Sequence, residues 1–143
     1  MKLVHLTSSR FFGGPERQML GLARALSPDV STAFVSFAED GLCADFLDRA
    51  RAEGFEAVAL RRDTPRLRAA LGELTALLAR LAPDALLCHG YKADLVGLLA
   101  ERRRRIPVVG VSRGWTGECL RVRLYDALDR RVLRRLDRVV CVS

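Results

Sequence analysis

The feature of this sequence that most constrains its fold is a regular alternation between short β-rich runs and longer helical patterns. Six runs rich in apolar and β-branched residues recur along the chain: Leu3–Thr7, Val30–Phe37, Phe55–Leu60, Ala85–His89, Val108–Ser112 and Arg138–Val142. Five stretches with helical spacing lie between them: Pro15–Leu26, Leu42–Glu53, Pro65–Leu81, Lys92–Arg103 and Glu118–Leu136. Such a repeat requires parallel strands joined by right-handed crossovers. We therefore predict an α/β fold, a Rossmann-like doubly wound parallel sheet of about six strands with helices on both faces.

The third helical stretch shows the clearest periodicity. Its leucines recur at steps of three and four residues and share one face: Leu67, Leu71, Leu74, Leu78 and Leu81. Thr64 is placed to cap the helix, and Pro65 suits the first helical position. The pattern predicts a helix over 65–81 whose leucine face packs on the sheet.

Composition limits the kinds of protein that the chain can be. Its 143 residues match one domain, and 50% of them are hydrophobic, which is enough for a substantial core. No apolar run approaches the roughly 18 residues of a spanning helix. The N-terminus MKLVHLTSSR does not resemble a secretory signal, so we expect a cytoplasmic protein. The chain stops at the end of the sixth predicted strand, from which we expect a single N-terminal domain, residues 1–143, whose C-terminal partner domain is absent.

The positive charge and the cysteines each have a simple interpretation. The net charge of +7 comes almost entirely from arginine. It indicates either solvated helix faces or attraction to an anion such as a phosphate-bearing ligand or an anionic membrane. The cysteines Cys43, Cys88, Cys119 and Cys141 have no C-x-x-C spacing, so we expect reduced, mostly buried thiols and no zinc site.

The loop after the first predicted strand, SSRFFGGPERQ, has two adjacent glycines at a strand-to-helix junction. Gly13 and Gly14 permit positive φ and close approach to the backbone, and the helix N-terminus offers N–H groups to an anion. The spacing is neither G-x-G-x-x-G nor a Walker loop. Gly13, Gly14 and Arg17 are candidate contacts for a phosphate or polar sugar, with a tight turn as the structural alternative.

The loop after the fourth predicted strand reads CHGYKAD. His89 lies where the last side chain of a strand meets the ligand edge of such a sheet, so it can bond a substrate hydroxyl or phosphate. Lys92 can supply positive charge there, and Tyr91 is a further candidate contact. The alternatives are a structural histidine and a packed tyrosine.

The loop after the fifth predicted strand reads VSRGWTGE. The Arg113 guanidinium can form a bidentate pair of hydrogen bonds with a phosphate or carboxylate, and Trp115 can stack on a ring. Thr116 is a candidate contact or a helix cap, and Trp115 is alternatively a packed lid. The acidic residues after the second strand, Glu39 and Asp40, fit a turn better than a site.

Four segments together resemble the N-terminal domain of retaining group 1 glycosyltransferases, which have the GT-B fold. These segments are GGPERQMLGLARAL, DALLCHGYKAD, VVGVSRGWTGE and RVVCVS. The resemblance implies an acceptor-binding domain, with the nucleotide-sugar donor held by the C-terminal domain and no cofactor bound here. Gly13 and Gly14 match the family's glycine-rich loop, and His89 matches a histidine common after the fourth strand. Arg113 stands where many members have a sugar-contacting histidine, which favours an anionic group at this position.

The implied partners are a sugar, glycan or lipid-linked acceptor and, through the missing domain, a nucleotide-sugar. The fragment alone is expected to be inactive, with His89 and Arg113 as candidates for the chemistry. The basic stretch RVRLYDALDRRVLRRLDR has the pattern of a helix that packs on the core. A basic amphipathic helix also suits binding to an anionic membrane, here at its inner face. A non-catalytic nucleotide-binding or regulatory Rossmann module is the alternative, and without a nucleic-acid-binding motif no nucleic acid partner is expected.

Overall fold

The protein is described by a computed structural model that covers residues 1–113 and 120–142. Six parallel strands form one sheet in the order β3-β2-β1-β4-β5-β6. The strands are β1 (Lys2–Thr7), β2 (Ser31–Phe37), β3 (Glu56–Leu60), β4 (Ala85–His89), β5 (Val108–Ser112) and β6 (Arg138–Cys141). The predicted parallel α/β sheet is confirmed.

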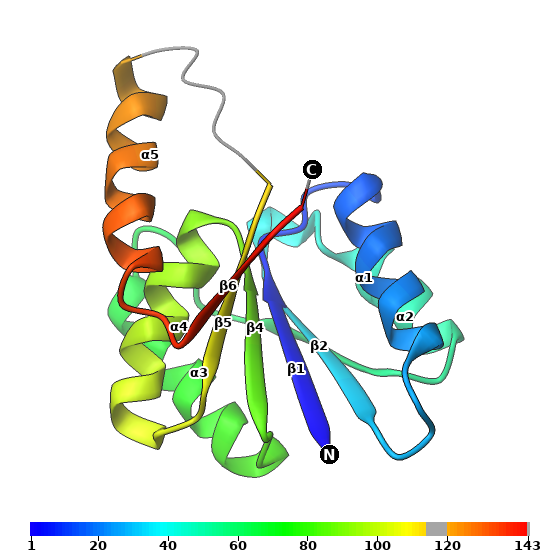
Figure 1. The fold of residues 1–143 in the computed structure, drawn as a ribbon. Coiled ribbons are helices and arrows are strands. Elements are labelled where there is room, and N and C mark those ends of the chain that lie inside the picture. Colours follow the sequence, from blue (N-terminus) through cyan, green and yellow to red (C-terminus); the bar gives the residue numbers. More distant parts are fainter. Residues whose placement is uncertain (114–119, 143) are drawn as a thin grey trace.

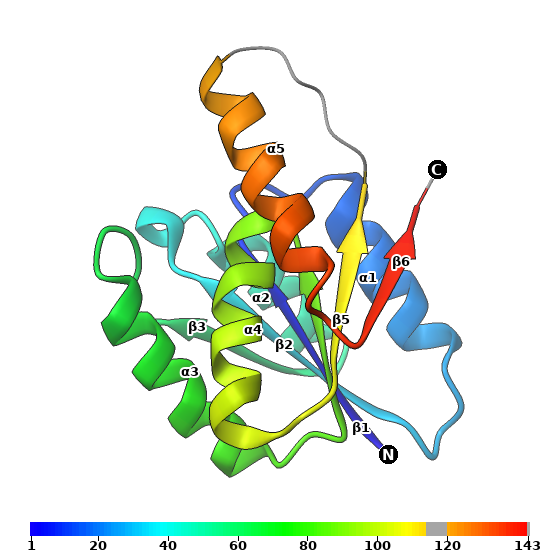
Figure 2. The same cartoon turned by 60° about the vertical axis from the view of Figure 1, so that its left-hand side comes forward.

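Helices cover the sheet on both faces, as predicted. They are α1 (Gly14–Ala25), α2 (Ala44–Ala52), α3 (Leu67–Leu81), α4 (Tyr91–Arg104) and α5 (Leu120–Leu133), with a short 3-10 helix η1 at Glu39–Gly41. α1 and α2 lie on one face, whereas α3, α4 and α5 lie on the other (Figure 1; Figure 2 gives a second view). None of the described helices is long and apolar enough to cross a membrane.

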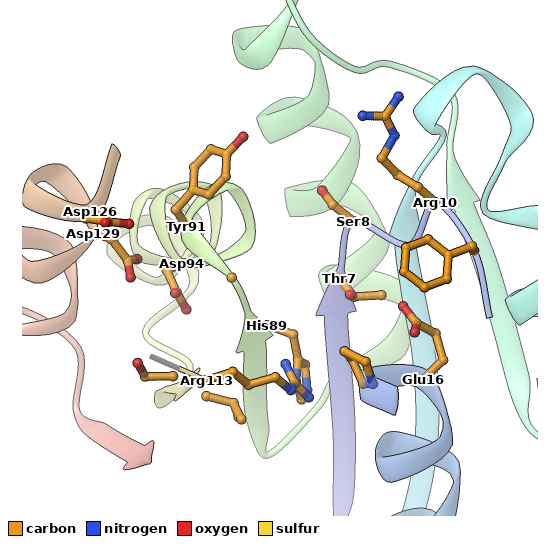
Figure 3. Close-up of a pocket in the computed structure, with 15 residues that line it drawn as sticks. Thr7, Ser8, Arg10, Glu16, His89, Tyr91, Asp94, Arg113, Asp126 and Asp129 are labelled. Atoms are coloured by element: carbon orange, nitrogen blue, oxygen red, sulfur yellow. The ribbon is translucent and has the colours of Figure 1, made fainter. Parts of the chain in front are cut away.

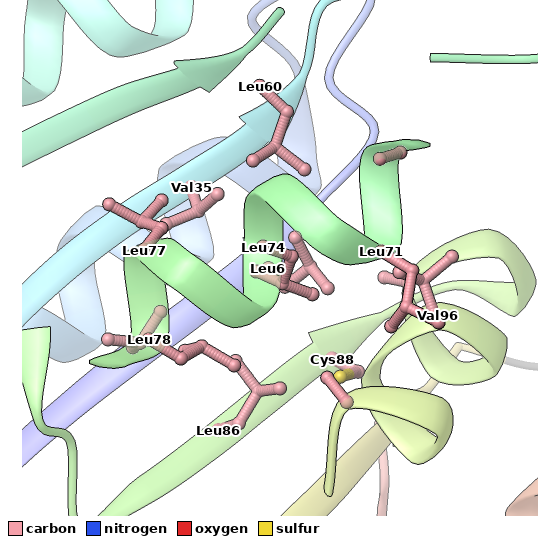
Figure 4. Packing of buried hydrophobic residues seen from close by; sticks show 14 of the residues in the cluster. Leu6, Val35, Leu60, Leu71, Leu74, Leu77, Leu78, Leu86, Cys88 and Val96 are labelled. Carbon is pink, nitrogen blue, oxygen red and sulfur yellow. The ribbon is translucent and has the colours of Figure 1, made fainter. Parts of the chain in front are cut away.

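Alternating side chains of β2 show why both faces are apolar. Val35 and Phe37 enter the core beneath α3 and α4, whereas Phe34 enters the core beneath α1 and α2. Successive side chains of a strand point to opposite faces, so a strand covered twice must be apolar at nearly every position. The leucine face of α3, including Leu74 and Leu78, packs into the first of these cores (Figure 4).

The start of α3 differs from the prediction. The helix begins at Leu67, and neither Thr64 nor Pro65 lies within it. The Thr64 hydroxyl donates to Asp63 Oδ1 at 3.3 Å, and the Arg66 amide donates to the Asp63 carbonyl at 2.7 Å. Because Asp63 organises a turn over these residues, Thr64 does not cap the helix.

The fifth helix is shorter than the predicted 118–136. It ends at Leu133, and residues 118 and 119 lie outside the described part of the chain. Gly110 in β5 permits its close packing, because a Cβ there would lie 2.6 Å from Leu133 Cδ2 and 2.7 Å from Leu136 Cδ1. The glycine thus sets how closely the end of α5 approaches the sheet.

Candidate functional site

A cleft of about 370 Å³ opens where the carboxyl ends of β1, β4 and β5 meet (Figure 3). The chain crosses from one side of β1 to the other between β3 and β4, so this edge is the topological switch point where doubly wound folds bind ligands. The polar side chains that line the cleft are Thr7, Ser8, Arg10, Glu16, His89, Tyr91, Asp94, Ser112, Arg113, Asp126 and Asp129.

A chain of hydrogen bonds leads from the core to the cleft through two histidines. His5 Nδ1 lies 2.9 Å from His89 Nε2, and His89 Nδ1 lies 3.1 Å from an Arg113 guanidinium nitrogen. A guanidinium can only donate, so His89 Nδ1 must accept. The proton of neutral His89 is therefore on Nε2, which donates to His5 Nδ1, and the proton of neutral His5 is on Nε2.

Both histidines are neutral at pH 7 in this arrangement. Burial and the positive charge of Arg113 lower the pKa of His5 to about 4. Burial, His5 and Arg113 lower the pKa of His89 well below its ordinary value. Arg113 is thus the permanently charged member of the chain, and its guanidinium also donates to Gln18 Oε1 at 3.3 Å.

The opposite wall of the cleft holds two buried carboxyl groups from different helices. Asp94 of α4 is 1% exposed, and Asp129 of α5 is also buried. Burial, followed by the charge of Asp129 and a hydrogen bond with it, raises the pKa of Asp94 to about 9. Asp94 is therefore a neutral carboxylic acid at pH 7, able to donate a hydrogen bond.

Three buried polar atoms lining this cleft have no hydrogen-bond partner among the described residues. They are Ser8 Oγ, Asp94 Oδ1 and Arg113 Nε. A buried polar group without a partner costs about 1–3 kcal/mol. A hydroxyl, a carboxyl oxygen and a charged N–H on residues that line one cleft suit a ligand that carries several hydroxyl or phosphate groups.

The structure brings together three of the candidate residues predicted from the sequence. His89, Tyr91 and Arg113 all line the cleft. The Tyr91 ring stacks on Tyr125 of α5 with ring centroids 5.0 Å apart, and the residue remains 49% exposed. Trp115 and Thr116 lie outside the described residues.

Lys92 makes two ion pairs within the protein. Its Nζ bridges Glu39, at 2.8 Å, and Asp63, and lies 4.4 Å from the Phe37 ring centroid. Two carboxylates therefore pair with the charge that was predicted to be available to an anion, and the contact of Lys92 with a ligand stays a prediction. Lys92 lines a smaller pocket of about 350 Å³ beside the cleft.

The glycine loop is also organised by a carboxylate. The Gly13 amide donates to Glu16 Oε2 at 3.0 Å, so Glu16 occupies the N-terminus of its own helix. Neither Gly13 nor Gly14 has a positive φ, and a Cβ on Gly13 would meet the Phe11 ring at 2.6 Å. Arg17 is exposed and stacks over Phe12. Gly13, Gly14 and Arg17 lie beside the cleft without lining it, and their ligand contacts stay predictions.

Four further residues belong to this site and were not predicted from the sequence: Ser8, Asp94 and Asp129, which line the cleft, and His5, which is hydrogen-bonded to His89. A polar or charged residue at a position expected to be buried could have marked two of them in the sequence. His5 interrupts an apolar strand, and Asp94 falls on the buried face of α4. In the described part of the chain, no three His, Cys, Asp or Glu side chains are grouped closely enough to hold a metal ion.

A family model decides what kind of domain carries this cleft. The model for the glycosyl transferase 4-like domain matches residues 13–143. The chain belongs to that glycosyltransferase family. Its six-stranded sheet, with helices on both faces, is that of one half of a GT-B fold, which the sequence resemblance predicted. No curated protein matches the chain.

Solved structures share the fold of this glycosyl transferase 4-like domain at low sequence identity. MurG of Acinetobacter baumannii has 16% identity and a TM-score of 0.67 over 99% of this chain and 41% of its own. The UDP-GlcNAc 2-epimerase of Neisseria meningitidis, bound to UDP-GlcNAc, has 20% identity and a TM-score of 0.66 over 93% of this chain and 38% of its own. MnaA of S. aureus, in a co-structure with UDP, has 16% identity and a TM-score of 0.67 over 98% of this chain and 38% of its own. This chain thus spans about two-fifths of these structures.

Proposed function

We propose that this glycosyl transferase 4-like domain is the acceptor side of a retaining enzyme. The enzyme would move a sugar from a nucleotide-sugar to a glycan or lipid-linked acceptor. The observation that carries the proposal is the cleft, with Ser8 Oγ, Asp94 Oδ1 and Arg113 Nε unpartnered among the described residues. Such groups gain most from a ligand rich in hydroxyls, because each hydroxyl both donates and accepts.

The two walls of the cleft suit different parts of the reacting complex. Arg113 is a fixed cation that favours a phosphate or another anionic group, and its charge stabilises negative charge developing on a leaving phosphate. Asp94, held as a neutral acid, favours a sugar hydroxyl. His89 holds Arg113 at 3.1 Å and has a lowered pKa, so we propose that it orients the guanidinium and does not carry charge itself.

The nucleotide is proposed to bind mainly outside this chain. Glu16 Oε2 accepts from the Gly13 amide at the N-terminus of α1, which is where a Rossmann nucleotide phosphate would bind. A phosphate there would meet a carboxylate. Two of the structural neighbours are described as complexes with UDP-GlcNAc or UDP, and each of them has a further 62% of chain beyond the matched part.

Titration calorimetry on the 143-residue chain separates this proposal from a nucleotide-binding module. We expect UDP and UDP-GlcNAc to bind no more tightly than about 1 mM. Saturation-transfer NMR with a panel of octyl glycosides should show contacts that are lost in Arg113→Ala and retained in Arg68→Ala, since Arg68 is exposed on α3 and does not line the cleft. A micromolar Kd for UDP, with no glycoside contact, would establish the nucleotide-binding alternative.

Transfer by the full-length protein tests the assignment of Arg113. Arg113→Ala is expected to lower kcat about 100-fold if the cation acts on developing charge. Arg68→Ala, which removes an equal charge from the exposed surface of α3 away from the cleft, should leave kcat within about 2-fold. Equal effects of the two substitutions would show that Arg113 has no specific role.

A further inference from the structure

Arginines on the two helical layers of the sheet differ in their ion pairing. On the α1–α2 layer, Arg24 pairs with Glu53, Arg49 with Asp45 at 2.8 Å, and Arg51 with Asp48 at 2.6 Å. On the α4–α5 layer, Arg102, Arg131 and Arg135 are exposed and make no ion pair with any described residue. Of the arginines on α1 and α2, Arg17 alone makes no ion pair with a described residue, so most of the unpaired positive charge lies on the other layer.

These three arginines surround a shallow groove of about 240 Å³ between α4 and α5. We call it the α4–α5 groove; it is lined by Leu95, Leu98, Leu99, Arg102, Leu128, Arg131, Val132 and Arg135. Leu99 is 37% exposed and Leu128 is 43% exposed. Leu124, one turn before Leu128 on α5, is 70% exposed. The surface thus combines free guanidinium groups with exposed leucines.

This combination distinguishes among anionic partners. Guanidinium groups can bind any phosphate, including those of nucleic acids. Exposed leucines gain nothing from a phosphate backbone, and the groove has no aromatic side chain for stacking on bases. At a membrane, by contrast, leucines enter the boundary between headgroups and acyl chains while arginines reach the lipid phosphates.

We propose that the α4–α5 groove docks this protein on an anionic phospholipid surface. The proposal does not rest on the proposed function, because the groove shares none of its lining residues with the cleft. Asp126 and Asp129 of α5 line the cleft, whereas Leu128 and Arg131 of the same helix line the groove together with Arg135, which follows the end of the helix. Docking through the groove therefore leaves the cleft accessible to a ligand.

Sedimentation with large unilamellar vesicles tests the proposal. The chain should bind vesicles of phosphatidylcholine with 30% phosphatidylglycerol and not those of phosphatidylcholine alone. Each arginine near such a surface changes partitioning about 5-fold, so Arg131→Ala with Arg135→Ala should weaken binding roughly 25-fold. Leu99→Ser with Leu128→Ser should also weaken it, at unchanged net charge.

A matched control removes two arginines from the other layer. Arg24→Ala with Arg49→Ala lowers the net charge equally, and binding should change less than about 3-fold. Equal losses in the two arginine pairs, or no dependence on phosphatidylglycerol, would overturn the proposal. Binding of single-stranded RNA in preference to the vesicles would also overturn it. Circular dichroism checks that every variant is folded.

Discussion

At the scale of single residues, one guanidinium sets the protonation of two histidines. Arg113 can only donate, so the protons of His89 and His5 are assigned in turn along the hydrogen-bonded chain. The two rings also stack, with centroids 5.1 Å apart. His5 thereby acts on the cleft through His89 as a positioning residue.

His5→Leu removes the acceptor for the His89 Nε2 proton. We expect a loss of about 0.5–1.5 kcal/mol in the free energy of unfolding at pH 7.5, because the His5–His89 hydrogen bond is lost, while the buried His5 Nε2, which has no partner among the described residues, is removed with it. Thr32→Val is the control, since the buried Thr32 hydroxyl has no partner among the described residues and its removal should not destabilise the protein. Urea unfolding measures the stability of both variants. Equal losses of stability would contradict the series of hydrogen bonds from Arg113 through His89 to His5.

The lowered pKa of His5 also predicts the response to acid. Its pKa falls from 6.5 in the unfolded chain to about 4 in the folded protein, so the unfolded chain binds more protons between these values. The free energy of unfolding should fall as the pH drops from 6.5 to 4, by about 1.4 kcal/mol per unit for His5 alone. In His5→Leu this slope should be smaller. A slope equal to that of the parent protein would contradict the assignment.

The raised pKa of Asp94 predicts that its contribution to the free energy of unfolding changes with pH in the opposite direction. Its pKa rises from 3.8 to about 9 on folding, so the folded protein binds the extra proton and loses stability as the pH rises through this range. Asp94→Asn removes this cost, and we expect stabilisation by on the order of 1–3 kcal/mol at pH 8 and little change near pH 4. Thermal unfolding at both pH values measures the effect. A variant that is destabilised at pH 8 would show that Asp94 is needed there as an ion.

At the scale of elements, Lys92 ties the loops after β2 and β3 to the start of α4. Its Nζ contacts Glu39 and Asp63, and the side chain is 12% exposed. Lys92→Met leaves two carboxylates without their shared cation, so we expect a loss of about 2–4 kcal/mol in urea unfolding. The triple variant with Glu39→Gln and Asp63→Asn should recover most of this loss. No recovery would mean that the ammonium acts through packing alone.

Gly110 controls how α5 packs on the sheet. Gly110→Ala forces Leu133 or Leu136 to move, because the new Cβ would lie less than 3 Å from each, and we expect a loss of about 1–3 kcal/mol. Gly72 lies within α3 with nothing within 4 Å of an added Cβ. Gly72→Ala should stabilise the protein by about 0.5–1 kcal/mol. Differential scanning calorimetry compares the two variants, and changes in stability of the same sign would contradict the packing argument.

At the scale of the whole molecule, β6 forms an exposed edge of the sheet. Every residue of β6 is exposed, and Val140 is 49% exposed. An apolar edge strand can pair with other chains. Val140→Lys should therefore reduce self-association in concentrated solution, measured by light scattering, with little change in thermal stability. Unchanged scattering would show that this edge does not associate.

The architecture was predictable from the sequence, whereas most of the site was not. Alternating apolar runs and the leucine face of α3 predict the parallel sheet and its helices, because these patterns depend only on local periodicity. His89 and Arg113 were predicted as candidate contacts because His89 ends β4 and Arg113 follows β5 at the ligand edge of the sheet. Asp94 and His5 acquire their roles from partners 35 and 84 residues away along the chain, Asp129 and His89. No local pattern encodes such pairing.

Helix α5 presents a carboxyl pair to the cleft and an arginine-leucine surface to the outside. A helix is a stiff rod, so any rotation of α5 at a lipid surface also moves Asp126 and Asp129. If vesicle binding changes the affinity of the cleft for a ligand, that ligand must change vesicle affinity by the same factor. If the protein docks on lipid as proposed, the two surfaces of α5 would make its affinity for a ligand depend on the composition of the membrane.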